Sequence, residues 1–357
     1  MDKLWWRQIP NASRFISSIV GMLSEGKNVF LVIPEQIPWY DTFKNDFEIA
    51  QRQELGSYGI DTIKDDLEVD PGKILLDSYC KKELVDDYRP AIGYAKFLSE
   101  QDSIPLNNAI VWVRVDDSNR AEKWGEFVSN YASNTVEKST RGLFVIEIIN
   151  SIDISDYKMV YGIDYQDYIS KFDCYIYSIL ASSMLNESKV IKEYLAELCT
   201  TVVCDDIELV EHCVNIRKYK EFLKNPFKII NSIIDKERRS DGGVFSSIYN
   251  RQVVDKAIWD AQVKCLFPII ESYRDCFIKK YYQKISEKMP ISSSSGEIYD
   301  KPEDVEIGTL YFMICSNLIS VSTDDFEKTK MFKEARNKLA HLDVLSFDEV
   351  KKITITI

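Results

Sequence analysis

The chain has 357 residues, of which 45% are apolar and 29% are charged. This composition is typical of globular proteins, excludes collagen-like and disordered chains, and at this length favours two or three domains. The formal net charge of −12 argues against a general nucleic-acid binder. Because no apolar run approaches a membrane span and no hydrophobic signal region opens the chain, we expect a cytoplasmic protein without membrane contact.

The first 150 residues predict an α/β domain. Helical periodicity over 11–24 stops near Gly26, and further helices are expected at 74–100 and 119–133. Three continuous apolar runs, at 28–34, 109–115 and 142–148, predict buried strands. Since buried strands alternate with helices, we predict a parallel sheet that is covered on both faces.

This order of elements resembles that of P-loop NTPases, but the phosphate-binding loop is missing. After the first strand the chain reads Pro34-Glu35-Gln36, without the glycines and the Lys-Ser/Thr pair of a Walker A motif. Asp116-Asp117 closes the second strand, either as a Walker-B-like acidic end or as ordinary turn chemistry. We therefore predict a degenerate NTPase-like platform that does not hydrolyse ATP.

Residues 151–240 read as a mainly helical connector. The stretch 236–243, charged and ending in Gly-Gly, predicts an exposed linker, and paired acids such as Asp65-Asp66 are expected to be solvated. The eight cysteines are scattered without metal-ligand spacing, so we expect reduced thiols, no metal and no cofactor. Residues 1–244 carry a net charge of −11 (29 basic, 40 acidic), which makes this acidic portion a candidate protein-binding surface.

Residues 245–357 predict an all-α domain with a net charge of −1 (16 basic, 17 acidic). A long helix is expected from 246 to 288 with Pro268 as a candidate break, followed by a polar loop over 289–304. Helices at 305–321, 324–341 and 347–353 finish the chain. A capping box, Ser346 to Glu349, opens the last of them.

The helix over 324–341 carries the residues with the clearest chemistry. Its apolar positions recur every three or four residues, while Asn337 and His341 share another face. Arg336 precedes them and can hold a phosphate with a forked set of donors. Histidine is the side chain best suited to move protons near neutral pH, so this group is a candidate for metal-free RNA cleavage.

The run Arg336-Asn337-Lys338-Leu339-Ala340-His341 resembles the Arg-Asn-x-x-Ala-His motif of the HEPN superfamily. The resemblance implies an all-α bundle over 245–357 that dimerises and cleaves RNA as a toxin or anti-phage effector. In that reading Arg336, Asn337 and His341 are catalytic, and Lys333 and Lys338 contact the RNA backbone. Three alternatives stay open: a purely structural Arg–His pair, a non-catalytic HEPN-like scaffold for other proteins, and a degenerate nucleotide sensor that a nucleotide would stabilise.

Overall fold

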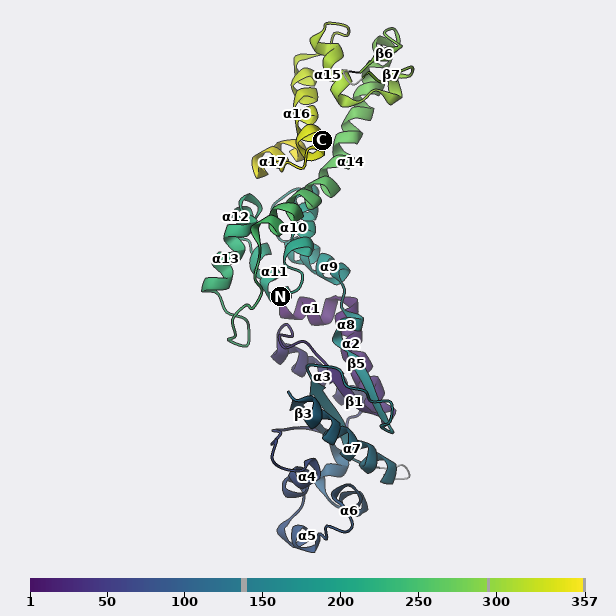
Figure 1. The fold of residues 1–357 in the computed structure, drawn as a ribbon, viewed down its shortest axis with the longest axis vertical. Helices are drawn as coiled ribbons and strands as arrows, with labels where there is room; N and C mark the ends of the chain where they lie inside the picture. Colours follow the sequence, from purple (N-terminus) through teal and green to yellow (C-terminus); the bar gives the residue numbers. More distant parts are fainter. Residues whose placement is uncertain (136–139, 294–295, 356–357) are drawn as a thin grey trace. The chain divides into compact units, whose positions relative to one another are not determined.

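The computed structural model describes residues 1–135, 140–293 and 296–355, which form two compact units, Met1–Asp173 and Cys174–Ile357 (Figure 1). The finer division into domains 1–150, 151–240 and 245–357 stays a prediction. An α/β first part and a mainly helical second part are confirmed. Within the described ranges, no helix is both long and apolar enough to cross a membrane.

The first unit contains a five-stranded parallel sheet in the order β2-β3-β4-β1-β5. The three central strands confirm the predicted ones: β1 (Asn28–Val32), β3 (Ala109–Val115) and β4 (Leu143–Ile148). The edge strands β2 (Gly59–Ile63) and β5 (Val160–Asp164) were missed. The helical reading of 151–240 is thus wrong at β5. Both edge strands are partly exposed, so they lack the continuous apolar run of a central strand.

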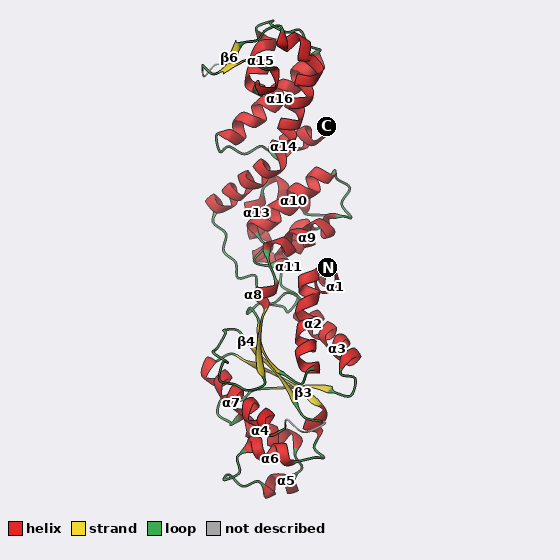
Figure 2. Cartoon of the chain, turned by 90° about the vertical axis from the view of Figure 1, so that its right-hand side faces the viewer, coloured by secondary structure: helices red, strands yellow, loops and turns green. Residues whose placement is uncertain are grey.

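Helices cover both faces of this sheet, α2 and α3 on one side and α4, α6 and α7 on the other (Figure 2). Alternate side chains of the strands face the two layers: Phe30 and Val111 join the α4–α7 core, whereas Trp112 contacts Phe43 and Phe47. The predicted helix over 74–100 is three short helices. The helices of this unit are α1 (Asp2–Gln8), α2 (Pro10–Ser24), α3 (Tyr40–Glu54), α4 (Pro71–Tyr79), α5 (Lys82–Asp87), α6 (Tyr94–Glu100), α7 (Ser118–Asn134) and α8 (Tyr165–Tyr168), with a 3₁₀ turn η1 (Pro105–Asn108).

The second unit is helical. The predicted polar loop over 289–304 contains a short hairpin of β6 (Ile291–Ser292) and β7 (Ile298–Tyr299); positions 294–295 of that loop lie outside the described residues. The helices here are α9 (Lys171–Ser182), α10 (Lys189–Val202), α11 (Ile207–Val214), α12 (Tyr219–Lys224), α13 (Pro226–Lys236), α14 (Arg251–Ser286), α15 (Ile307–Cys315), α16 (Thr323–Ala340) and α17 (Phe347–Ile355), with a 3₁₀ turn η2 (Pro302–Asp304).

The long helix α14 is the spine against which α16 packs (Figure 1). It continues through Pro268, the predicted break, and departs from helical geometry at Tyr281 instead (φ −113°, ψ 19°). The side-chain amide of Gln262 binds the backbone of Leu345 twice: Nε2 donates to its carbonyl at 2.8 Å and Oε1 accepts from its N–H at 2.7 Å. This buried clamp fixes the chain between α16 and α17 on α14.

The stretch 236–243 is not a free linker. Arg239 is buried, and its guanidinium forms ion pairs with Asp206 and, at 3.3 Å, with Glu208, both also buried. The N–H and hydroxyl of Ser240 donate to Glu208 at 2.7 and 2.8 Å. Charges of this kind are held in an interior only when they are paired, so this segment is anchored on α11.

Candidate active site

The helix α16 begins at a strong cap. The Ser322 hydroxyl accepts from the N–H of Asp325 at 3.1 Å, and acidic residues occupy the first turn, where the helix dipole favours them. Phe332, Ala335 and Leu339 are buried on the face toward the bundle, and the Phe332 ring stacks on Tyr273 with centroids 4.1 Å apart. The sequence periodicity therefore predicted the packed face of α16 correctly up to Leu339. It is wrong for Leu342, the next apolar position of the same pattern, which lies beyond the helix end and is 71% exposed.

Asp325 ties the start of α16 to the kink of α14. One of its carboxylate oxygens accepts from Lys280 at 2.7 Å, from the Tyr281 hydroxyl at 2.6 Å and from Ser322 at 2.6 Å. Burial opposes the charge, but the three donors outweigh it and lower the pKa of Asp325 to about 2. Tyr281, whose hydroxyl donates to this carboxylate, is also the residue at which the backbone of α14 departs from helical geometry.

We expect Asp325→Asn to lower the free energy of unfolding by about 2 kcal/mol at neutral pH, because the folded pKa lies below the unfolded one. This contribution is complete above the unfolded pKa near 4 and disappears as the pH falls from there toward 2. Urea titrations of both proteins from pH 7 downward measure it.

Asp324→Asn is the matched control. Its carboxylate is 72% exposed and pairs with Lys328 one turn along the helix, so its loss should change stability by no more than about 0.5 kcal/mol. Equal effects of the two substitutions would contradict the role given to Asp325.

The end of α16 holds His341 at the C-cap. The N–H of Asp343 donates to the Lys338 carbonyl at 2.9 Å and that of Leu342 to Leu339 at 3.3 Å, the pattern of a Schellman motif. Leu342 has φ +63°, a left-handed conformation that costs a leucine about 1–2 kcal/mol. Trp259 of α14 donates to the Leu339 carbonyl at 2.7 Å and anchors this turn.

None of the three predicted catalytic residues is buried at this helix end. His341 is exposed and Asn337 is half-buried, and neither side chain makes a hydrogen bond within the described part of the chain. Arg336 is a third exposed and pairs with Glu306, the N-cap of α15, at 3.2 Å. Since a helix turns about 100° per residue, His341 lies about 40° from Asn337 but about 140° from Arg336.

The two lysines predicted to contact RNA are exposed or half-buried on the same helix, and each has a contact. Lys338 pairs with Glu349 at 2.7 Å, and the Lys333 ammonium lies 5.1 Å from the centre of the Tyr311 ring. Glu349 also accepts from the N–H and hydroxyl of Ser346 at 2.8 Å each, which confirms the predicted capping box. Both lysine contacts are solvent-accessible, so both are weak and exchangeable.

The arrangement fits acid–base chemistry on an anionic group. An exposed imidazole can exchange protons with a bound molecule, and a guanidinium can hold a phosphate oxygen. The structure brings Asn337 and His341 onto neighbouring positions but leaves Arg336 facing Glu306. In the described ranges, no three His, Cys, Asp or Glu side chains are grouped closely enough to hold a metal ion.

The sequence reading missed two buried charge clusters in the first unit. Asp65, predicted to be solvated, has a side chain only 8% exposed; it accepts hydrogen bonds from both Nε and Nη2 of the buried Arg120 and from Trp124 Nε1 at 2.9 Å. The prediction for Asp65 is wrong because Arg120 of α7 lies against the chain that follows β2 and forms a buried ion pair with it. The only sequence signal was an arginine inside the apolar stripe of α7.

The second cluster lies under α3 on the other face of the sheet. Glu147 of β4 is 1% exposed and accepts from the Tyr40 hydroxyl at 2.7 Å and from Trp112 Nε1 at 2.8 Å. The Lys44 ammonium lies 3.3 Å from the Trp112 ring centre without a hydrogen-bond acceptor among the described atoms. Burial lowers the pKa of Lys44 to about 7, against the opposing attraction of Glu147 and Glu48.

We expect Lys44→Met to raise the free energy of unfolding at pH 7 by about 2 kcal/mol, because methionine fills the same space without a buried amine. Between about pH 7 and 10 the unfolded wild type binds more protons than the folded one. Wild-type stability should therefore rise with pH relative to the variant across this range. Urea titrations at the two ends test this, and a variant less stable at pH 7 would contradict it.

No protein-family model matches this chain, and no curated protein is found to be similar to it.

Proposed function

We propose that this protein is a metal-independent endoribonuclease whose active site is built from the C-terminal ends of α16 in two chains. His341 transfers the proton, as base to a ribose 2′-OH or as acid to the leaving 5′ oxygen. Arg336 holds the phosphate and stabilises its added charge, and Asn337 orients the imidazole or the phosphate. The 2′ oxygen forms a bond to phosphorus while the P–O5′ bond breaks, which leaves a 2′,3′-cyclic phosphate and a 5′-OH.

The observation that supports this proposal is the pair of half-buried Asn337 and exposed His341 at a helix end that is held on both sides; in the described residues neither side chain makes a hydrogen bond. Trp259, the Schellman turn and the Gln262 clamp fix the backbone on both sides of His341. A proton-transfer site needs a held backbone and an imidazole that is free to bind the substrate, and the described residues around His341 provide both. A histidine kept only for packing would be expected to lie against other side chains, as half-buried His212 lies against Phe245.

The angular separation of Arg336 and His341 supports a shared site. About 140° around one helix places the two side chains on different sides of it, so one chain alone has difficulty in presenting both to the same phosphate. A symmetric pair of chains places the arginine of one helix opposite the histidine of the other. Arg336 would then leave Glu306 and bind the phosphate. Its ion pair with Glu306 is exposed to solvent, so breaking it costs little free energy.

The charge of the chain fits a regulated effector better than a general ribonuclease. The acidic portion over 1–244 repels RNA, whereas α16 carries Lys330, Lys333 and Lys338, of which Lys338 would have to leave its exposed ion pair with Glu349 to attract it. We propose a toxin or anti-phage defence role in which the acidic portion receives a protein partner or another trigger.

A second candidate, a non-catalytic scaffold, is favoured by one observation. Arg336 is engaged with Glu306 and Lys338 with Glu349, so the predicted catalytic arginine and one predicted RNA-binding lysine already have partners. In this case the helix end would serve as a docking surface for other subunits of a defence complex.

Incubation with total RNA and with tRNA in EDTA distinguishes the two. The ribonuclease predicts cleavage by the wild type and none by the Arg336→Ala/His341→Ala double variant. Cleavage at equal rates by both proteins would contradict the assigned site. Absence of cleavage by either, in the presence of a binding partner recovered with the protein, would support the scaffold.

A further inference from the structure

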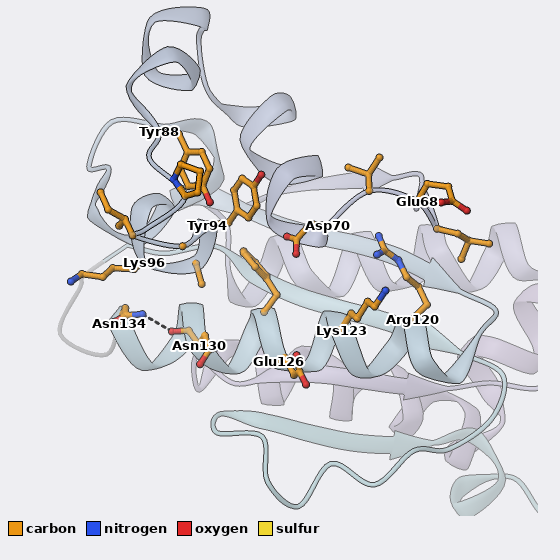
Figure 3. A pocket seen from close by; sticks show the side chains of 17 residues that line it. Glu68, Asp70, Tyr88, Tyr94, Lys96, Arg120, Lys123, Glu126, Asn130 and Asn134 are labelled. Carbon is orange, nitrogen blue, oxygen red and sulfur yellow. Dashed lines mark hydrogen bonds between the residues drawn. The ribbon is translucent and has the colours of Figure 1, made fainter.

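A groove of about 750 Å³ runs along α7 in the first unit (Figure 3). The helix lines it with residues three or four positions apart, which form one stripe about 20 Å long. The opposite walls are the segments 67–70, after β2, and 88–96, before and within α6. The groove is of a size that holds a small molecule. The residues of the stripe are Arg120, Lys123, Glu126, Phe127, Asn130 and Asn134.

Lys123 supplies an uncommitted positive charge to this groove. Figure 3 shows its ammonium directed into the groove beside Arg120, with Asp70 opposite. Asp70 is engaged as the N-cap of α4, where it accepts from the Gly72 N–H at 2.8 Å, and Arg120 is bound to Asp65. Lys123 itself has no ion pair or hydrogen bond in the described part of the chain, so it remains free to hold an anion.

The wall over 88–96 adds an aromatic and apolar surface. Tyr88 and Tyr94 stack with centroids 4.3 Å apart, and Leu67 and Ile92 also line the groove although they are 64% and 40% exposed. Exposed apolar side chains in a polar groove favour a ligand with a planar, partly apolar portion. The side-chain amide of Asn130 makes no hydrogen bond in the described residues, and an amide can pair with the edge of a nucleobase.

We propose that this groove binds a nucleoside monophosphate, with the phosphate on Lys123 and the base beside Tyr94 and Ile92, its edge on Asn130. Seven residues of α7 separate Lys123 from Asn130, a rise of about 10 Å, comparable to the reach from the phosphate to the base edge of a nucleotide. The carboxylates of Glu68 and Glu126 line the same groove and disfavour a longer phosphate chain. The site is separate from the proposed RNA-cleaving residues and does not depend on them.

Calorimetric titration of the full chain with AMP, GMP, CMP and UMP tests the proposal. We expect saturable binding of at least one of these nucleotides. Lys123→Ala should lower its affinity tenfold or more, and Asn130→Asp should change the order of affinities among the four nucleotides. Lys3→Ala removes an exposed lysine of α1 outside the groove and should bind as the wild type does.

Three results would overturn the proposal: no saturable binding up to millimolar nucleotide, equal affinity of the wild type and Lys123→Ala, or inorganic phosphate binding as tightly as the nucleotides. Lys123 is exposed and has no ion pair or hydrogen bond to the described residues, so its substitution should leave the thermal unfolding of the free protein unchanged. That measurement separates a lost ligand contact from a lost fold.

Discussion

Replacing His341 by alanine should lower the rate of RNA cleavage at least a hundredfold, because a positioned general acid or base contributes about 10²–10⁴ to such reactions. His341 is exposed and makes no side-chain hydrogen bond in the described residues, so its loss should leave the folded bundle intact. Cleavage of a labelled RNA in EDTA, with circular dichroism of both proteins, measures the two effects separately.

The matched control is Asp343→Ala, an exposed residue two positions further along the same turn. It keeps the backbone N–H that closes the Schellman motif and should cleave at the wild-type rate. A His341→Ala protein that cleaves as fast as the control would remove His341 from the mechanism.

Mixing two inactive variants tests whether the site is shared between chains. A dimer with composite sites has two of them, each made of the arginine of one chain and the histidine of the other. When one chain carries Arg336→Ala and its partner carries His341→Ala, one site loses both residues and the other keeps both. Mixed proteins should then regain part of the activity. If both residues act within one chain, the mixture stays as inactive as its components.

The largest expected loss of stability comes from Arg239→Ala. This substitution leaves the buried carboxylates of Asp206 and Glu208 beside each other without their cation, and burial already raises the pKa of Asp206 despite Arg239. Removing one partner of a buried ion pair typically costs about 3–5 kcal/mol. We expect a loss of this size in the free energy of unfolding at pH 7, measured by urea titration.

Arg238→Ala provides the comparison, because Arg238 is the adjacent arginine and is exposed. Its guanidinium donates only to the neighbouring Glu237 carbonyl in the described contacts, so we expect a change below about 0.5 kcal/mol. A loss at Arg239 no larger than this would mean that segment 236–243 is the free linker that its composition predicts.

The elements that could be predicted from the sequence are those whose buried apolar residues form a continuous run or a regular periodicity. The strands β1, β3 and β4 are buried on both faces and read as continuous apolar runs, and the packed face of α16 follows its periodicity. The edge strand β2, Gly-Ile-Asp-Thr-Ile, is partly exposed and carries no such run. Local composition therefore could not distinguish it from a loop.

Buried charges were the main source of error. Asp65 and Arg239 look like surface residues in the sequence, and Glu147 interrupts an otherwise apolar run. Each is buried with a partner far along the chain that neutralises or binds it. Such pairs depend on tertiary contacts that one sequence does not reveal. The candidate site at Arg336, Asn337 and His341 could be proposed from the sequence because its residues lie within six positions at one helix end, whereas the pairing of Arg336 with Glu306 was not predictable.

The most direct test of the central claim is to replace the attacking group in the substrate. An RNA that the protein cleaves is resynthesised with a single 2′-deoxynucleotide on the 5′ side of the cleaved bond. Our account predicts that cleavage at that bond stops while other bonds are still cut, and that products from unmodified RNA carry 2′,3′-cyclic phosphate ends. Cleavage of the deoxy-substituted bond at an unchanged rate would contradict attack by the 2′-OH, and with it the roles assigned to Arg336 and His341.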